Sequence, residues 1–559
     1  MKKHLITSAL PYANGPLHFG HIAGVYLPAD IYTRHLKRMG ERAIHISGSD
    51  EHGVAITQNA QKQKKDYKEY VDSWHKEHKD LFSSYGIEFD FFGQTSSEYH
   101  KEETLKWFDD LYEKGFIEKQ EDQQLQCKSC SNYLPDRYVE GTCYECGYEK
   151  ARGDECPNCG TWIDALKLKN PVCQFCESTD IHTVKVDQWY LMLSKFHNEF
   201  REWFSTKKDW KKTVWNFVDS LSKEGMIDRA ITRDLDWGID VPLVEAKGKK
   251  LYVWFDAPIG YVSNTKQYLE SIDSKEDYLK DWWSNDNVKI TNFIGKDNII
   301  FHSIIFPVMS MASQKIRAVD NLPANQYVNL AGKQFSKSQG WYVDADQAID
   351  SFGQDALRYY LATLIPENTD SSFEWDQFEA RLNGELANNI GNFISRSFGF
   401  AFKNFPEGFS SDDIQSFWQS DEFSRLKKLC DQYHEQMNNC SFREALQSLM
   451  SIGKEANTYF SDQAPWAQMK EDPEKAKQTL CWATIYGCVI SEYASCFMPN
   501  LSLNIQSLID LNIETNLFYL RDWKQITTNL NLLKINSKPK PLVPKIDSDV
   551  LNKFKDQLK

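Results

Sequence analysis

Four Cys-x-x-Cys pairs within fifty residues constrain this chain more than any other feature of its sequence. The pairs are Cys127/Cys130, Cys143/Cys146, Cys156/Cys159 and Cys173/Cys176. A gap of two residues lets both thiolates of a pair reach one tetrahedral ion, and two pairs complete its four ligands. Redox dithiols are the alternative, but the repeated spacing is the one expected of zinc sites. The spacing predicts structural zinc and leaves open which pairs share an ion.

Length and composition place this metal-binding segment inside a much larger globular protein. The chain has 559 residues, 41% hydrophobic and 26% charged, which indicates three or four domains. Its net charge of -14 argues against a protein that coats nucleic acid nonspecifically, without excluding local basic patches. No apolar run is long enough for a secretory signal or a membrane span. We therefore expect a cytoplasmic protein, in which the other five cysteines are buried apolar residues.

The alternation of strands and helices predicts a doubly wound parallel sheet. Residues 3–8 read as a strand, apolar residues recur at helical spacing between His21 and Met39, and Ala43–Ser47 reads as the next strand. The same alternation resumes at Val288–Ile294 and Asp297–Ala312, beyond the cysteine pairs. We expect a Rossmann-type α/β domain that is split by the metal-binding insertion. From about residue 385 the pattern becomes helical.

Two short motifs suit the binding of a polyphosphate. His18-Phe19-Gly20-His21 lies where the first strand turns into the first helix, and a helix N-terminus attracts phosphate. Gly20 leaves room for close approach. Ser336-Lys337-Ser338 lies in a loop flanked by glycines, where a lysine and hydroxyls can hold phosphates. Taken singly, the histidines are more typical of a metal pair or a surface, and the loop of an ordinary solvated turn.

In this order along the chain, the motifs resemble those of class I aminoacyl-tRNA synthetases, in the form used by the methionyl-tRNA synthetase family. Residues 11–21 resemble the HIGH signature, 334–338 the KMSKS loop, 252–261 and 293–297 two further blocks, and 388–396 and 464–466 the anticodon-binding helices. The resemblance extends to about residue 540. Gln334 and Phe335 replace the first lysine and the methionine of KMSKS, which predicts a different balance of loop closure. Asn298 replaces an apolar residue that some relatives place in the amino-acid pocket.

The resemblance implies a methionine–tRNA ligase. Such an enzyme activates methionine with ATP and Mg²⁺ to methionyl-adenylate and transfers it to initiator and elongator tRNA(Met). The implied catalytic residues are His18, His21 and Lys337; the ATP-binding residues are Gly20, Lys296, Asp297, Lys337 and Ser338, with Arg233 a candidate at the adenylate site. The implied methionine-binding residues are Leu10, Tyr12, Asp50, Trp254, Ala257, Pro258, Tyr261 and His302, with Asp50 on the amino group. The implied anticodon-binding residues are Asn392, Arg396 and Trp466.

The family also implies a division of the chain and a nested arrangement of zinc ligands. The expected parts are the first catalytic half (1–115), the zinc-binding insertion (116–230), the second catalytic half (231–325), a stem-contact region with the KMSKS-like loop (326–384), the α-helical anticodon-binding domain (385–540) and a linker with a charged tail (541–559). Relatives with a single zinc use the pairs that match Cys143/Cys146 and Cys156/Cys159. The outer two pairs are then expected to share a second ion.

Three alternative functions fit the sequence less well than a methionine–tRNA ligase. A class I synthetase for another amino acid is disfavoured by the small zinc-bearing insertion and by the block 252–261. A non-catalytic tRNA-binding scaffold should have lost His18, His21 or Lys337, and all three are retained. A free-standing zinc ribbon that binds nucleic acid would not need nucleotide-binding halves on both sides. We expect a monomer that binds neither DNA nor membranes, and a pocket that also activates some homocysteine because one methylene is worth only about 1–3 kcal/mol.

Overall fold

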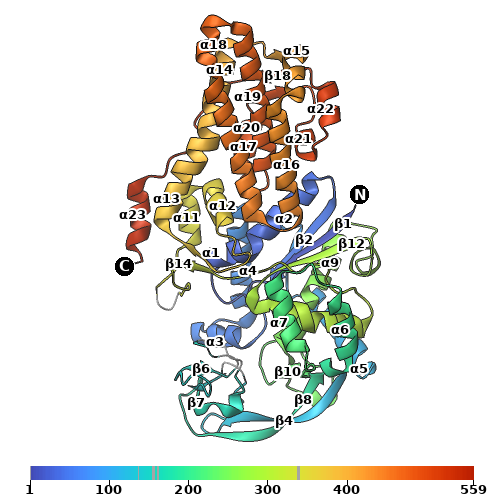
Figure 1. Ribbon diagram of the computed structural model, residues 1–559. Helices are drawn as coiled ribbons and strands as arrows, with labels where there is room; N and C mark the ends of the chain where they lie inside the picture. The colour runs from blue at the N-terminus through green and yellow to red at the C-terminus, as the bar shows by residue number, and fades with distance from the viewer. Residues whose placement is uncertain are drawn as a thin grey trace.

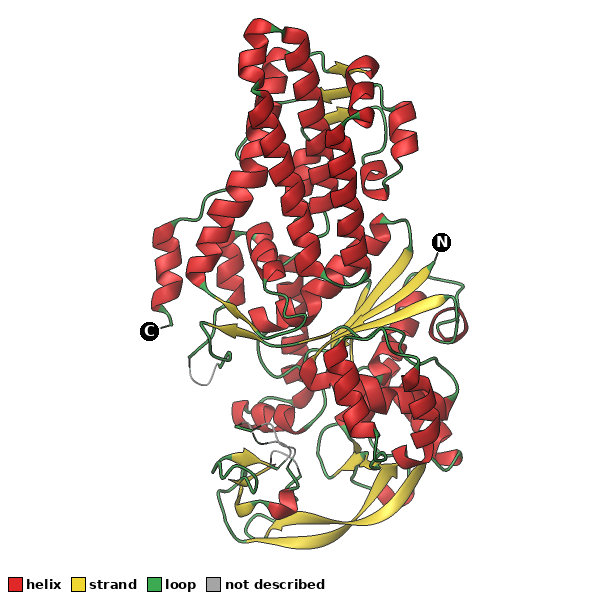
Figure 2. Ribbon diagram, in the orientation of Figure 1, coloured by secondary structure: helices red, strands yellow, loops and turns green. Residues whose placement is uncertain are grey.

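The computed structural model describes residues 2–135, 138–153, 156, 158–159, 163–336 and 340–558. A parallel sheet occupies the centre of the molecule, a long helical bundle stands on one side of it, and a β-rich insertion lies on the other (Figures 1 and 2). Within the described ranges, no helix has both the length and the apolar character that a membrane crossing requires.

The central sheet has five parallel strands in the order β13-β12-β1-β2-β3. These strands are β1 (Lys3–Ser8), β2 (Arg42–Ser49), β3 (Phe91–Gln94), β12 (Val288–Gly295) and β13 (Ala324–Asn325). Strand β1 is almost entirely buried, as expected of a strand covered on both faces. The strand order reverses between β1 and β12, so a crevice opens at their carboxyl ends. This confirms the predicted class I fold with a split parallel sheet.

The first crossover follows the predicted helix closely. A short turn α1 (Phe19–His21) leads through a π-helical segment (Ile22–Tyr26) into α2 (Leu27–Arg38), which packs on β2. Every residue from Ile22 to Thr33 is buried. The crossover therefore presents its N-terminal turn, with both histidines, directly at the crevice.

The insertion is built on a long antiparallel ribbon. Strand β4 (Ile117–Cys127) pairs with β8 (Ile181–Leu191) along its full length, from Ile117 opposite Leu191 to Cys127 opposite Ile181. The far end carries a small sheet of β5 (Val139–Thr142), β6 (Ala151–Arg152) and β7 (Lys169–Cys173). This end docks back on the sheet domain, since the hydroxyls of Tyr138 and Thr57 lie 2.6 Å apart. Thr57 belongs to α3 (Val54–Gln63), which borders the crevice.

The C-terminal region is largely helical, as expected. Its principal helices are α14 (Asn392–Asn404), α16 (Asp421–Asn438), α17 (Phe442–Gln463), α18 (Pro465–Glu471), α19 (Pro473–Ala494) and α20 (Pro499–Gln506). Helix α19 is buried on nearly all sides, which explains its apolar composition. A small antiparallel sheet of β16 (Phe409–Ser410), β18 (Leu532–Ile535) and β17 (Ile509–Leu511) also forms here and was not predicted.

The last residues differ from the charged tail that the sequence suggested. They form helix α23 (Ser548–Asp556), which returns to the side of the molecule that carries α11 (Ala345–Phe352) and α13 (Trp375–Ala380) (Figure 1). Leu551 and Phe554 share one face of α23, and the Phe554 ring lies 5.1 Å from Phe352 and 5.0 Å from Trp375. Two apolar residues spaced by three give this otherwise polar segment one buried face.

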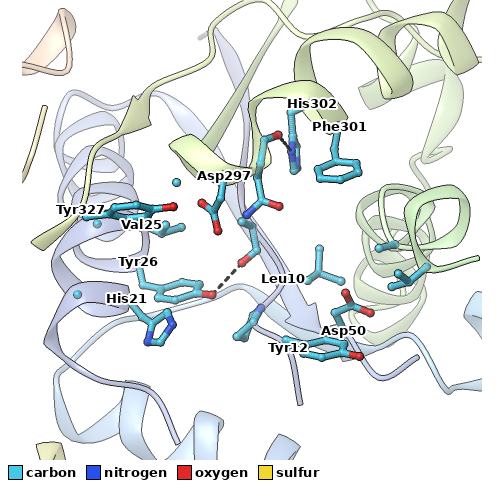
Figure 3. Close-up of a pocket in the computed structure, with 18 of the residues that line it drawn as sticks. Leu10, Tyr12, His21, Val25, Tyr26, Asp50, Asp297, Phe301, His302 and Tyr327 are labelled. Carbon is cyan, nitrogen blue, oxygen red and sulfur yellow. Dashed lines mark hydrogen bonds between the residues drawn. The ribbon is translucent and has the colours of Figure 1, made fainter. Parts of the chain in front are cut away.

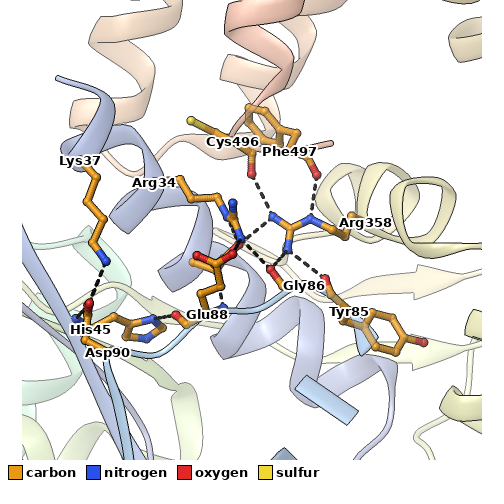
Figure 4. Close-up of polar contacts among 11 residues, drawn as sticks. Arg34, Lys37, His45, Tyr85, Gly86, Glu88, Asp90, Arg358, Cys496 and Phe497 are labelled. Carbon is orange, nitrogen blue, oxygen red and sulfur yellow. Dashed lines mark hydrogen bonds and ion pairs between the residues drawn. The ribbon is translucent and has the colours of Figure 1, made fainter. Parts of the chain in front are cut away.

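A buried arginine joins the helical region to the sheet domain. Arg358, on α12 (Gln354–Thr363), is fully buried and lies beside Arg34, Cys496 and Phe497 (Figure 4). Its guanidinium donates to the carboxylate of Asp30 at 2.7 Å. It also donates to the backbone carbonyls of Tyr85 (3.0 Å), Gly86 (3.1 Å), Cys496 (2.9 Å) and Phe497 (2.9 Å). Burial alone would raise the pKa of Asp30, but Arg358 and Arg34 outweigh it and lower that pKa. One side chain therefore ties α2, the loop after α4 (Tyr67–Ser84) and the end of α19 together.

Candidate functional site

A cavity of about 850 Å³ lies at the carboxyl ends of the central strands (Figure 3). It brings together most of the residues that the motifs singled out: Leu10, Tyr12, His18, Gly20, His21, Asp50, Trp254, Ala257, Pro258, Tyr261, Asp297 and His302. These residues come from positions up to 292 apart in the chain and meet only because the parallel strands end at one edge.

The two histidines of the first motif form one end of the cavity. The imidazole Nδ1 of His18 accepts from the backbone N–H of Gly20 at 3.1 Å, and Nδ1 of His21 accepts from the N–H of His18 at 3.1 Å. A side chain at Gly20 would approach the His18 ring to 2.9 Å, so glycine is needed for the ring to lie there. Although His21 opens into the cavity, desolvation and then His78 lower its pKa. Both rings are thereby oriented as hydrogen-bonding groups.

The end of β12 supplies an acidic group. Asp297 lines the cavity, and a Cβ at Gly295 would lie 2.5 Å from its carboxylate. Burial raises the pKa of Asp297, partly offset by backbone N–H groups and by Lys296. Lys296 itself is turned to Asp370, at 3.0 Å, and its ammonium lies 4.0 Å from the centre of the Tyr327 ring. Gly295 and Asp297 therefore form a compact acceptor site, with Lys296 at its margin.

The opposite end of the cavity combines a carboxylate with an apolar wall. Asp50 follows β2 directly, and its backbone forms a β-bridge with Tyr12. The carboxylate Oδ1 of Asp50 is buried and has no hydrogen-bond partner among the described residues. Gly53 has φ +112°, and a Cβ there would lie 2.8 Å from the Tyr12 hydroxyl. Trp254 packs edge-on against Phe301 at 4.3 Å. This end can receive a positively charged group attached to an apolar chain.

His302 sits in the apolar wall as a neutral imidazole, because burial lowers its pKa to about 4. Its Nδ1 donates to the carbonyl of Asn298 at 3.0 Å, so its Nε2 accepts from the hydroxyl of Tyr261 at 2.7 Å. Asn298 lines the cavity too, at the position where some relatives have an apolar residue. The wall around the expected methionine side chain thus carries an ordered hydrogen-bond chain behind its aromatic surface.

The KMSKS-like loop reaches the cavity from the other side. Gln334 and Phe335 line it, and the Phe335 ring stacks on His18 at 4.3 Å and 7°. Lys337 and Ser338 lie outside the described residues. Phe335, in place of the usual methionine, therefore links this loop to the histidine motif by an aromatic contact.

Arg233 lines a neighbouring cavity of about 340 Å³ instead of the large one. Its guanidinium lies 3.9 Å from the centre of the Tyr252 ring and donates to the carbonyl of Thr232 at 2.8 Å. Tyr252 and Trp254 line both cavities and form the partition between them. The role of Arg233 at the adenylate site stays a prediction.

The cysteine pairs form two groups of four in the nested arrangement. Cys127, Cys130, Cys173 and Cys176 form the outer group and Cys143, Cys146, Cys156 and Cys159 the inner group, each with all sulfur atoms within 4.8 Å. Neighbouring sulfurs are 3.6 and 3.7 Å apart in the outer group and 3.6 and 3.9 Å in the inner group. A tetrahedron with Zn–S bonds of about 2.3 Å has edges of roughly 3.8 Å. Both groups fit a four-thiolate zinc ion.

The residues expected to read the anticodon meet on the far helical domain. Asn392 and Arg396 are exposed one turn apart on α14, and the Arg396 guanidinium lies 5.5 Å from the centre of the Trp466 ring. Trp466, at the start of α18, is 44% exposed. An indole this exposed does not fill a core between two helices, so the Trp466 ring is accessible to a ligand at the surface.

Some residues of the cavity escaped the sequence reading. Asn158, between the inner cysteines, lines the cavity although the nearest motif of the cavity, Tyr252–Tyr261, is more than ninety residues away along the chain. Phe301 and Tyr327 line it as well (Figure 3). Only the docking of the insertion on α3 explains the position of Asn158. No local pattern could have predicted it.

Comparison with known proteins places the chain in a family. Residues 4–398 match the family described as tRNA synthetases class I (M), and residues 418–559 match the anticodon binding domain of methionyl tRNA ligase. The chain is 40% identical over 491 residues to the methionine–tRNA ligase of Pelodictyon phaeoclathratiforme, covering 86% of this chain and 69% of that one. It is 37% identical over 531 residues to the ligase of Rubrobacter xylanophilus, covering 92% and 91%.

The fold agrees with these matches. A structure of Mycobacterium tuberculosis methionyl-tRNA synthetase in complex with methionyl-adenylate superposes with a TM-score of 0.76 at 21% identity, covering 97% of this chain and 100% of that one. The sequence matches, the split parallel sheet and the helical domain lead to one conclusion: the chain belongs to the methionine–tRNA ligase family of class I aminoacyl-tRNA synthetases.

Proposed function

We propose that this enzyme joins methionine to tRNA(Met), initiator and elongator, in two steps driven by ATP in the cytoplasm. The observation that carries this proposal is the single cavity that combines a histidine pair, an acidic ribose site and an apolar pocket closed by a carboxylate. Each of the three parts matches one part of a methionyl-adenylate: phosphate, nucleoside and amino acid.

In the first step, a carboxylate oxygen of methionine attacks the α-phosphorus of ATP, and the bond to pyrophosphate breaks. His18 and His21 hydrogen-bond the phosphate oxygens, and Lys337 neutralises charge on the departing group, with Mg²⁺ accompanying ATP. Asp297 accepts from the ribose hydroxyls, and Gly20, Lys296 and Ser338 complete the ATP site. In such a transfer the protein acts mainly through positioning and charge stabilisation.

Methionine lies in the other end of the cavity. Asp50 pairs with its α-ammonium group, and its thioether packs on the aromatic wall, where sulfur makes favourable contacts. The remaining pocket residues are Leu10, Tyr12, Trp254, Ala257, Pro258, Tyr261 and His302. In the second step, the terminal ribose hydroxyl of tRNA attacks the methionyl carbonyl carbon and AMP leaves.

Methionine-dependent exchange of pyrophosphate into ATP tests the first step directly, and Lys337→Ala tests its mechanism. Because Lys337 acts on charge that develops in the transition state, its removal should slow adenylate formation about 10²–10³-fold. Methionine affinity should stay nearly unchanged. Stopped-flow measurement of adenylate formation separates the two effects, with Lys315→Ala, which removes a half-buried lysine paired with Asp110, as the control.

A Lys337→Ala protein with a normal rate and much weaker methionine binding would reverse this assignment. A wild-type protein that binds tRNA without any exchange would instead support the non-catalytic scaffold. Exchange with a different amino acid would support a synthetase of other specificity.

We propose zinc as the ion of both cysteine groups. At this position zinc supplies only structural cross-links, since four thiolates leave no open coordination site. We expect elemental analysis to find about two zinc ions per chain, one for each four-thiolate site. Cys146→Ser should lower the zinc content to about one ion per chain. Cys481→Ser, at a buried cysteine of α19, should leave it unchanged. One zinc ion per wild-type chain, or a Cys146→Ser protein with the same zinc content as the wild type, would contradict the assignment.

We propose that Asn392, Arg396 and Trp466 read the anticodon. An unpaired base can stack on the exposed indole while the amide and guanidinium bond its edges. Trp466→Ala should therefore weaken tRNA charging, mostly through apparent affinity, since a stacked base is worth about 1–3 kcal/mol. Pyrophosphate exchange and melting temperature should change little.

The matched control is Trp418→Ala, which removes a tryptophan of the same domain that packs on Phe417 and Phe423. That variant should lose stability without a selective loss of charging. Full charging by a stable Trp466→Ala protein would refute the anticodon assignment.

A further inference from the structure

Three rings are stacked at the histidine end of the cavity. The ring of Phe335 lies 4.3 Å from the imidazole of His18, with the two ring planes 7° apart. The imidazole of His21 lies 3.8 Å from that of His18 and is tilted by 34°. Two rings at these contact distances cannot share one face of an imidazole, so His18 is enclosed between Phe335 and His21. The proposed reaction gives a task to both histidines and none to Phe335.

The stack acts on the faces of the His18 ring and not on its nitrogen atoms. The Nδ1 atom accepts a hydrogen bond from the backbone N–H of Gly20 at 3.1 Å. A neutral imidazole has one ring proton, so this proton is carried by Nε2, which is then a donor. Contacts on both faces oppose rotation of the ring out of its plane. Phe335 and Gly20 together therefore determine the direction in which the Nε2–H of His18 points.

The loop that carries Phe335 is fastened to the histidine turn. The backbone N–H groups of Ser336 and Trp341 each donate to the carbonyl of the other residue at 2.8 Å. The indole of Trp341 donates to the last carbonyl of β14 (Val328–Leu330), also at 2.8 Å. Strand β14 in turn contacts α1, the turn that begins next to His18. The base of the loop therefore holds the Phe335 ring close to the imidazole.

The shape of this contact separates positioning from the mere covering of apolar surface. Phe335 is half-buried, and an aliphatic side chain such as leucine would also cover the His18 ring. Only an aromatic side chain offers a flat face that can lie parallel to the imidazole. A leucine would therefore keep much of the packing but would allow the imidazole to tilt.

On the basis of the proposed function, we propose that Phe335 is a positioning residue, which holds the imidazole of His18 so that its Nε2–H meets a phosphate oxygen of ATP. Phe335 itself touches neither substrate and acts through His18. A hydrogen bond that is strongest in the transition state contributes to the rate, and its misalignment lowers kcat more than it weakens substrate binding. Methionine binding, at the other end of the cavity, does not depend on Phe335.

The first test is methionine-dependent pyrophosphate exchange by Phe335→Leu and Phe335→Tyr. For Phe335→Leu we expect kcat to fall about tenfold, with the KM for methionine unchanged. Phe335→Tyr retains a flat ring and should keep a kcat close to that of the wild type. The matched control is Phe116→Leu, at a half-buried phenylalanine that packs edge-on against Phe196 at 4.7 Å and lies outside the lining of the cavity. It should keep the wild-type kcat.

Combined variants identify the residue through which Phe335 acts. The effects of two substitutions add when they are independent and fail to add when one acts through the other. In a His18→Ala protein, Phe335→Leu should therefore cause no further loss of kcat. In a Lys337→Ala protein it should still cause the full loss of about tenfold, although Lys337 follows Phe335 by only two positions in the sequence.

Nuclear magnetic resonance of the whole protein with labelled histidines tests the stack without catalysis. The ring current of Phe335 lowers the chemical shifts of protons that lie over its face, here the carbon-bound imidazole protons of His18. Loss of these signals in His18→Ala assigns them. In Phe335→Leu they should move toward the shifts of the other histidines, and in Phe335→Tyr they should stay.

A Phe335→Leu protein with the wild-type kcat, or with unmoved His18 signals, would overturn the inference. So would an equal loss of kcat in the His18→Ala and Lys337→Ala backgrounds, because that pattern indicates lost packing. A loss that disappears only in the Lys337→Ala background would make Lys337, and not His18, the group on which Phe335 acts. A wild-type protein with shifted His18 signals but without methionine-dependent exchange would instead refute the proposed function, which separates the two failures.

Discussion

The buried contact between Arg358 and Asp30 is the interaction on which the arrangement of this enzyme most depends. Asp30 lies on the first crossover helix, whose N-terminal turn carries the histidine motif, and Arg358 lies among the helices that lead to the anticodon-binding domain. The same guanidinium donates hydrogen bonds to the backbone carbonyl of Tyr85, after α4, and to that of Cys496, after α19. A charge in the interior is tolerated only when it is paired and its donors are satisfied. Here that requirement determines how the helical bundle sits on the sheet.

The sequence predicted those features that depend on local pattern. The strands at 3–8 and 288–294 and the first crossover helix were predicted because hydrophobic periodicity determines them. The spacing of the cysteines predicted metal ligands, whereas their nested grouping was predicted from the resemblance to the family. Helix α23 and the approach of Asn158 to the cavity were not, since both depend on packing between segments distant in sequence. The junction at Arg358 was missed for the same reason, because a lone arginine in a helical pattern reads as a solvated residue.

The chemistry of the pocket also depends on burial more than on residue identity. His302 is neutral because it is buried, which makes it part of an oriented hydrogen-bond chain with Tyr261 and not a cation. Burial raises the pKa values of Asp297 and Asp50, and both side chains face the cavity. There the ribose hydroxyls or the ammonium group of the proposed substrate would replace the polar contacts with water that burial removes. Under the proposed function, the substrate groups bound by Asp297 and Asp50 compensate for this burial. This is the arrangement expected where binding energy is used for selection.

The most direct test of this view is the urea unfolding of Arg358→Ala, followed by circular dichroism. Removing Arg358 takes away one of the two cations beside the buried Asp30 carboxylate and deprives four backbone carbonyls of this donor, so we expect the free energy of unfolding to fall by about 3–5 kcal/mol. Arg381→Ala, which breaks an exposed pair with Glu385, should change it by less than about 1 kcal/mol. If Arg358→Ala unfolds with the same midpoint and slope as the wild type, the junction does not hold the two domains together.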